Sequence, residues 1–174
     1  RKEGGRAFTI SADITDEEHV GRMIDEARIG LGGLDGMVLN VGIGAGTLGL
    51  ANVKADDWDT TLATNLRGPS LGCRDALPVL ADGSSIVFIS SIAGITSGSR
   101  LPAYDASKAA LGGLMRHVAR EGATRGIRAN VVAPGLVDTP LGRLATAGRP
   151  SRAATNVPFG RQATAWEIAY AVLF

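Results

Sequence analysis

Tyr104 and Lys108 lie four residues apart in a stretch of small residues, and Ser91 precedes them in the chain. Residues at this spacing share one face of a helix, which brings the lysine ammonium close to the tyrosine phenol. A nearby positive charge favours the phenolate form of a tyrosine, whose pKa is ordinarily about 10. Such a phenol could exchange a proton with an alcohol or a ketone. Ser91 could donate a hydrogen bond to the same substrate oxygen.

The residues around this pair are small, which keeps the helix surface low beside a flat ligand. They include Ala103, Ala106, Ser107 and Ala109. Taken alone, however, a tyrosine followed four residues later by a lysine is a common pattern. An exposed tyrosine that packs on the stem of a lysine would account for it equally well.

Strand-like and helix-like patterns alternate along the chain and would position these residues. An alternating segment at 6–15 breaks at Asp13, and a helix follows it with Thr15 as N-cap and Glu18 completing a capping box. Buried strands are expected at 34–42, 84–91 and 126–135, and helices at 56–80, at 103–124 and from about Thr164. Alternation of this kind predicts an α/β fold with a doubly wound parallel sheet of Rossmann type, in one domain over 1–174.

Polar and glycine residues follow the predicted strands where a ligand would bind. They are Asp13, Asn40, Val41 and Gly42, Ser90 and Ser91, and Pro134 and Gly135. Ligands of doubly wound sheets bind beyond the carboxyl ends of the strands, so this coincidence favours a binding site at that edge.

Five motifs in the same order resemble those of the classical short-chain dehydrogenase/reductase family. They are "ADITD", "DDWDTTLATNL", "FISSIAG", "YDASK" and "NVVAPGLVDT". The resemblance extends through essentially the whole chain, and the "VPFGRQATAWEIA" tail is most similar to that of 3-oxoacyl-acyl-carrier-protein reductases. The resemblance implies an NAD(P)-dependent oxidoreductase that interconverts an alcohol and a ketone by hydride transfer.

The resemblance also implies four catalytic residues. Tyr104 is the acid/base, and Ser91 orients and polarises the carbonyl oxygen. Lys108 lowers the tyrosine pKa and binds the nicotinamide ribose, while Asn65 holds a water that links the lysine to solvent. Pro69 lacks the N–H that would bond the Asn65 carbonyl, which leaves that carbonyl able to accept from water. Pro69 could equally serve only to kink a long helix around the core.

The implied cofactor is NAD or NADP, with the choice between them not readable from these residues. Its contacts by resemblance are Asp13 and Ile14 at the adenine, Asn40, Val41 and Gly42 at the adenosine ribose, Tyr104 and Lys108 at the nicotinamide ribose, and Pro134, Gly135, Val137 and Thr139 at the nicotinamide. Thr139 also precedes Pro140, so it is expected to cap a helix.

The family's glycine-rich fingerprint T-G-x-x-x-G-x-G does not occur in these residues. The family's strand order 3-2-1-4-5-6-7 would place two further strands between Phe8–Ala12 and Met37–Asn40, and the strand that usually ends the fold is also missing. These 174 residues are thus expected to belong to a longer polypeptide, and to bind little dinucleotide alone. The alternative is a catalytically dead fragment that acts as a binding or assembly module.

Composition and net charge limit the expected binding partners and the expected cellular location of the protein. The net charge of +1 favours no nucleic-acid partner, and no apolar run approaches membrane-spanning length. The single cysteine, Cys73, fits a reducing compartment, so a cytoplasmic enzyme is expected. His19 and His117 have no Cys, His or Asp at ligand spacing, so no metal site is expected. We further expect a small alcohol or ketone substrate, a substrate-side flap at 146–154, and a homodimer or homotetramer formed through the helices at 57–80 and 103–124.

Overall fold

The computed structural model describes residues 5–44, 46–96, 98–147, 157 and 159–174. In these ranges three strands form one parallel sheet in the order β1, β2, β3. The strands are β1 (Gly36–Leu39), β2 (Ser85–Ile89) and β3 (Arg128–Val132), with Val38 opposite Val87 and Val87 opposite Asn130. The predicted fold class, an incomplete doubly wound parallel sheet, is confirmed.

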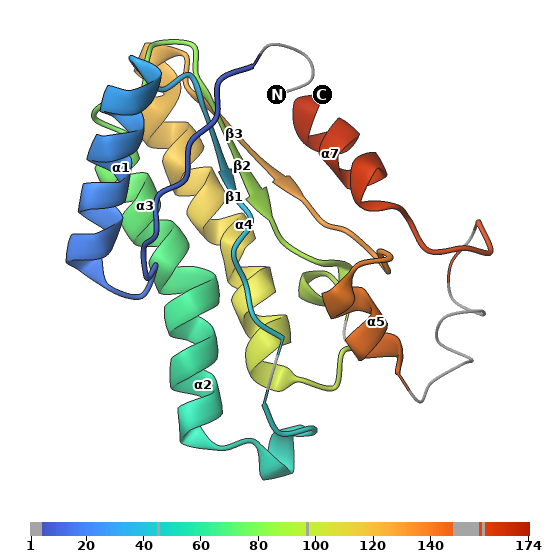
Figure 1. Cartoon of the computed structure of the whole chain (residues 1–174). Helices are drawn as coiled ribbons and strands as arrows, with labels where there is room; N and C mark the ends of the chain where they lie inside the picture. The colour runs from blue at the N-terminus through green and yellow to red at the C-terminus, as the bar shows by residue number, and fades with distance from the viewer. Residues whose placement is uncertain (1–4, 45, 97, 148–156, 158) are drawn as a thin grey trace.

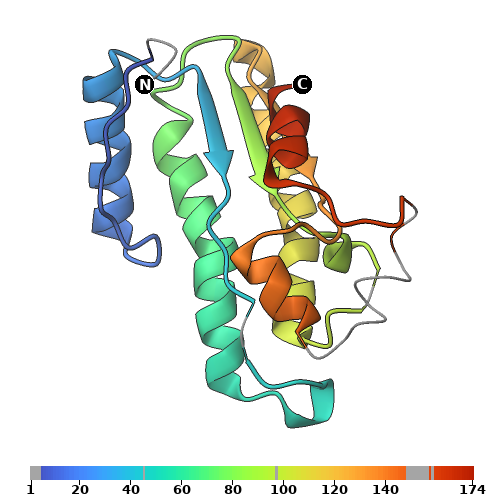
Figure 2. The ribbon, with the colours of Figure 1, turned by 45° about the vertical axis from the view of Figure 1, so that its right-hand side comes forward.

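Helices cover the two faces of this sheet unequally (Figures 1 and 2). One face carries α3 (Gly68–Ala76) and α4 (Pro102–Gly122), and α1 (Glu17–Leu31) packs outside α3. The opposite face carries α7 (Ala165–Leu173), which lies over β3. The shorter elements are α2 (Ala55–Leu62), α5 (Pro140–Thr146) and the 3-10 turns η1 (Leu50–Asn52), η3 (Ile92–Gly94) and η4 (Ala123–Arg125).

The core lies between the sheet and the layer of α3 and α4. Its fully buried members include Phe88 and Ile86 of β2, Leu111 of α4, and Leu80. Gly72 of α3 allows close contact with β1, because a β-carbon there would stand 2.9 Å from the Met37 methyl. Because the three strands pair in parallel, their carboxyl ends lie at the same edge of the sheet.

The predicted strand at 6–15 is wrong. Residues 5–13 form no strand, and the Phe8 ring instead lies against Gly30 of α1. A strand requires a neighbour for its backbone N–H and C=O groups, and none of the described strands pairs with this segment.

The predicted cap of α1 is also shifted by one residue. Asp16, and not Thr15, is the N-cap, because its carboxylate accepts from the backbone N–H of His19 at 3.0 Å. Thr15 instead forms hydrogen bonds with Asp13. The Asp13 carboxylate accepts from both the backbone N–H and the hydroxyl of Thr15, each at 2.8 Å.

The long helix predicted at 56–80 is interrupted. Between α2 and α3 lies a π-helical turn, η2 (Ala63–Arg67), in which Gly68 N–H donates to the Ala63 carbonyl. The bulge places Asn65 at the buried side, with the exposed fraction of its side chain near 1%. Single π-turns inside α-helices often occur at functional sites.

Candidate active site

Lys108, one of the predicted catalytic residues, is buried in the structure. Its side chain extends from α4 to the end of β2, where Nζ donates to the Ile89 carbonyl at 2.9 Å. The residue is 5% exposed, and this burial lowers the pKa of the ammonium to about 8, because a charged group is less stable away from water.

Tyr104 lies one helical turn before Lys108, as the spacing predicted. The lysine Nζ is 5.8 Å from the centre of the tyrosine ring, which is within the range of a cation–π contact. The ring also lies close to the segment after β1, where a β-carbon at Gly44 would stand 3.7 Å from the ring.

Gly42 lies close to the side chains of both Lys108 and Asn65. A β-carbon at Gly42 would stand 3.1 Å from Lys108 Nζ and 3.3 Å from Asn65 Oδ1. The structure thus brings Gly42, Asn65, Tyr104 and Lys108 into one cluster at the carboxyl ends of β1 and β2.

Asn65 is held by its whole amide group. Its Oδ1 accepts from the Ile43 N–H at 2.8 Å, and its Nδ2 donates to the Ile43 carbonyl at 2.9 Å and to the Ser107 hydroxyl at 3.0 Å. Ser107, which is fully buried, donates in turn to the Tyr104 carbonyl at 2.7 Å. The sequence had indicated Ser107 only as a small neighbour, and no pattern along the chain signals this link to a residue 42 positions away.

Ser91 follows β2 and begins the turn η3. Its Oγ accepts from the backbone N–H of Ala93 at 3.1 Å, which leaves the hydroxyl hydrogen able to donate to a ligand. The adjacent Ile92 N–H donates to the Pro134 carbonyl at 2.9 Å, so the Ser91 segment and the loop after β3 lie side by side.

The residues predicted at the nicotinamide lie on that loop. Gly135 is exposed, and Val137 forms an isolated parallel bridge with Ala163. Thr139 caps α5 as predicted, because its Oγ1 accepts from the Gly142 N–H at 3.1 Å.

Of the five residues predicted at the adenine and its ribose, Gly42 lies in the catalytic cluster and the other four lie outside it. Asp13 lies in the exposed loop before α1, and its two bonds from Thr15 lower the pKa of the carboxyl. Ile14 packs against Gly68, where a β-carbon would stand 2.9 Å from the isoleucine Cδ1. Asn40 and Val41 are exposed at the end of β1.

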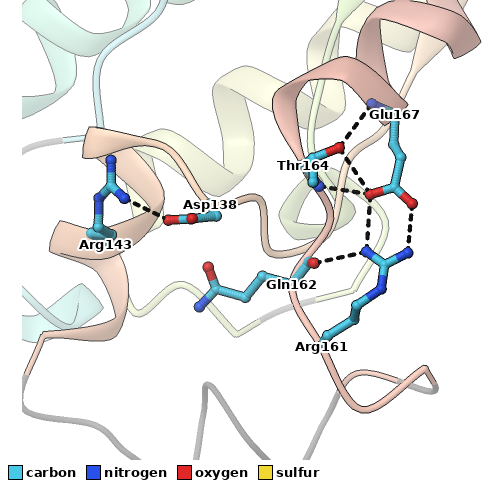
Figure 3. Close-up of a pocket in the computed structure, with 6 residues that line it drawn as sticks. All are labelled: Asp138, Arg143, Arg161, Gln162, Thr164 and Glu167. Carbon is cyan, nitrogen blue, oxygen red and sulfur yellow. Dashed lines mark hydrogen bonds and ion pairs between the residues drawn. The ribbon is translucent and has the colours of Figure 1, made fainter.

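A hollow of about 600 Å³ lies between α5 and the start of α7 (Figure 3). Arg143 pairs there with Asp138 at 2.8 Å, and Arg161 pairs with Glu167 through two bonds, at 2.7 and 2.9 Å. These bonds from Arg161 lower the pKa of Glu167 to about 2, and Thr164 completes a capping box with it. The hollow lies next to Thr139, and residues 148–154 of the predicted flap lie outside the described residues.

Other sequence features carry no chemistry in this structure. Burial raises the pKa of the Cys73 thiol to about 12, which makes it a poor nucleophile. Within the described ranges, no three His, Cys, Asp or Glu residues gather closely enough to hold a metal ion. None of the helices described there is long and apolar enough to cross a membrane.

Comparison with known proteins identifies the family. A family model described as Enoyl-(Acyl carrier protein) reductase matches residues 1–174. The chain is 35% identical to cis-4-hydroxycyclohexanecarboxylate dehydrogenase of Sinomonas cyclohexanicum over 100% of its own length and 71% of that protein. It is also 35% identical to the 3-oxoacyl-[acyl-carrier-protein] reductase of Homo sapiens, over 98% of the chain and 71% of that protein.

A solved structure agrees with the sequence matches. ElxO with NADP bound superposes with a TM-score of 0.85 at 28% identity, over 95% of this chain and 68% of that one. The chain therefore belongs to the short-chain dehydrogenase/reductase family, and it is an oxidoreductase.

Proposed function

We propose that this protein interconverts an alcohol and a ketone, with NAD or NADP as hydride acceptor or donor. The observation that carries the proposal is the buried Lys108, whose ammonium lies between the end of β2 and the Tyr104 ring. A buried lysine is costly for a fold, because its charge loses hydration. A ligand-binding role accounts for its retention at the edge of the sheet where such folds bind ligands.

Tyr104 is the proton donor and acceptor in this proposal. Its phenol donates a proton to the carbonyl oxygen during reduction and takes it back during oxidation. Ser91 donates a hydrogen bond to the same oxygen and stabilises the negative charge that develops on it. Asn65 fixes the strand-end segment at Ile43 through its side chain, and its backbone carbonyl holds the water that connects Lys108 to solvent.

The residues of this chain fit the nicotinamide ribose of a dinucleotide. Lys108 Nζ uses one N–H on Ile89, which leaves further N–H groups for the ribose hydroxyls. Gly42 leaves the space above the lysine clear, because any β-carbon there would stand 3.1 Å from Nζ. When bound, the nicotinamide would supply the hydride for reduction of the ketone and accept it during oxidation of the alcohol.

The remaining predicted contacts support the rest of such a cofactor. Val137 and Thr139 would hold the carboxamide, beside Pro134 and Gly135. Asp13 and Ile14 would hold the adenosine half, and Asn40, Val41 and Gly42 would lie at its ribose. The NADP bound by ElxO, at 28% identity, supports the cofactor class.

Two relatives indicate which substrates to test. One is named for a cyclic hydroxy acid and the other for 3-oxoacyl groups, so both act on secondary alcohols or the corresponding ketones. The test follows NAD(P)H absorbance in the full-length protein with cis-4-hydroxycyclohexanecarboxylate and with a 3-oxoacyl thioester, using each cofactor in turn. We expect turnover in at least one combination and its loss in Ser91→Ala. No turnover with either substrate class and either cofactor would contradict the proposal.

We also propose that the protein is a cytoplasmic homo-oligomer, a dimer or tetramer. The interface would form from the helices at 57–80 and 103–124, which contact each other within the chain. Small residues of α4, among them Ala109, Ala110, Gly112 and Gly113, would allow a second subunit to approach closely.

A further inference from the structure

The peptide group of Lys108 is contacted by the segment that carries Ser91. Ser90, the residue immediately before Ser91, donates its hydroxyl hydrogen to the Lys108 carbonyl at 2.7 Å. Ser90 is 7% exposed, so this hydrogen bond is shielded from water. It joins the end of β2 to the backbone of α4 at the residue that we propose holds the ribose.

Gly94 contacts the same peptide group three residues beyond Ser91. A β-carbon at Gly94 would stand 2.7 Å from the Lys108 carbonyl carbon and 2.7 Å from the Ala109 nitrogen. Backbone atoms inside a helix cannot yield as the end of a flexible side chain can. Only glycine therefore allows the turn η3 to lie this close to α4.

Ser91 lies between these two contacts and is also fixed from the other side. The Ser90 N–H donates to the Val132 carbonyl at 2.8 Å, and the Ile92 N–H donates to the Pro134 carbonyl at 2.9 Å. The backbone on both sides of Ser91 is thus held between the end of β3 and α4, the helix that carries Tyr104.

We propose that Ser90 and Gly94 are positioning residues, which set the distance between the Ser91 hydroxyl and the Tyr104 phenol through their contacts with the Lys108 peptide. The inference rests on the proposed function, since it assumes that both hydroxyls act on one substrate oxygen. Displacing a catalytic group by about 1 Å costs on the order of 100-fold in rate.

The first test measures kcat and KM in Ser90→Ala, Ser90→Thr and Gly94→Ala, with the substrate that gives turnover in the assay above. We expect kcat to fall about 10-fold in Ser90→Ala and about 100-fold in Gly94→Ala, with little change in the KM of the cofactor. Ser90→Thr keeps the hydroxyl and should recover most of the rate. Gly21→Ala of α1 is the matched control, because its β-carbon would meet only Asp75 Oδ2 at 3.6 Å.

The decisive test repeats both alanine variants in a Ser91→Ala background. If Ser90 and Gly94 act by placing the Ser91 hydroxyl, neither variant should slow the enzyme further once that hydroxyl is gone. Equal fold-losses in the two backgrounds would overturn the inference. Ser90→Ala should fold even if Gly94→Ala does not, because the Lys108 carbonyl keeps its place in the α4 hydrogen-bond ladder.

The design separates this inference from the proposed function. A Ser91→Ala variant with wild-type kcat would contradict the role of Ser91 itself. A slow Ser91→Ala variant, together with a wild-type rate in both Ser90→Ala and Gly94→Ala, would overturn the positioning role alone.

Discussion

Lys108 shows how one buried charge connects stability with function. Within the part of the chain that the structure describes, the side chain makes one hydrogen bond, to Ile89, and it loses most of its hydration. Burial opposes the charged form, while the proposed chemistry needs a positive charge near Tyr104. Burial of Lys108 therefore lowers the free energy of unfolding, and it places a positive charge where the proposed chemistry needs one.

The pH dependence of stability tests this environment. The pKa of Lys108 is about 8 in the folded chain, below its ordinary 10.5. Between these two values the unfolded chain binds more protons than the folded chain, so the contribution of Lys108 to the free energy of unfolding rises with pH. Below pH 8 both states are protonated, and the desolvation cost is fully present.

We therefore expect the free energy of unfolding of the protein with Lys108 to rise relative to that of Lys108→Met from pH 8 to pH 10.5. Urea titrations of the full-length protein across this range measure the difference. Both proteins carry Tyr104→Phe in this comparison, so that the phenol next to Lys108 does not titrate, and the titrating groups away from Lys108 are common to both and cancel. Parallel curves for the two proteins would show that Lys108 is not buried in this way.

At the scale of the element, the π-helical turn between α2 and α3 joins the site to the loop before α1. Asn65 lies within this turn, and Gly68 begins α3 directly after it. Ile14 packs against Gly68 so closely that a β-carbon there would stand 2.9 Å from both the Ile14 carbonyl oxygen and its Cδ1. The same junction thus supports a catalytic candidate and a predicted adenine contact.

Two glycine substitutions test this junction. Gly68→Ala should lower the free energy of unfolding by about 1–3 kcal/mol, because the backbone of Ile14 must move. Gly21→Ala in α1 should raise it by up to about 1 kcal/mol, since alanine favours a helix and the space is open. Chemical denaturation compares the two variants. A Gly68→Ala protein as stable as Gly21→Ala would show that the contact with Ile14 is not close.

The proposed subunit interface is tested on α4. Among the described residues, a β-carbon at Gly113 would meet nothing closer than the Arg116 side chain, at 3.9 Å, so Gly113→Glu should leave the subunit folded. A bulky charge there should block close approach of a second copy. Sedimentation should show a dimer or tetramer for the wild type and for Gly21→Ala, and a smaller species for Gly113→Glu. A wild-type protein that sediments as a monomer would contradict the proposed interface.

At the scale of the whole molecule, local patterns predicted the elements that are local in origin. The apolar run before Ser90 predicted a strand, which is β2, and Tyr104 and Lys108 lie one turn apart on α4, as their spacing predicted. Thr139, which precedes Pro140, caps α5. Each of these depends on neighbours within a few residues, which is why the sequence was sufficient.

Features that depend on distant partners could not be predicted in the same way. The segment 6–12 has the alternation of a strand, but a strand also needs a neighbour to pair with. The Asp16 cap was missed because Asp13 competes for Thr15. The hydrogen bonds from Ser90 to Lys108 and from Asn65 to Ser107 join residues 18 and 42 positions apart. A serine in the sequence does not show which distant residue its hydroxyl will contact.

Turnover by a Tyr104→Phe variant of the full-length protein tests the central claim most directly. Phenylalanine keeps the ring that packs against Gly44 and removes only the hydroxyl, so folding and cofactor binding should be nearly unchanged. Without its proton donor the enzyme should lose on the order of 10²–10⁴-fold in kcat. A variant that binds NAD(P)H normally but turns over at least about 100-fold more slowly agrees with the account. Turnover close to that of the wild type would show that Tyr104 is not the acid/base and would contradict the proposed mechanism.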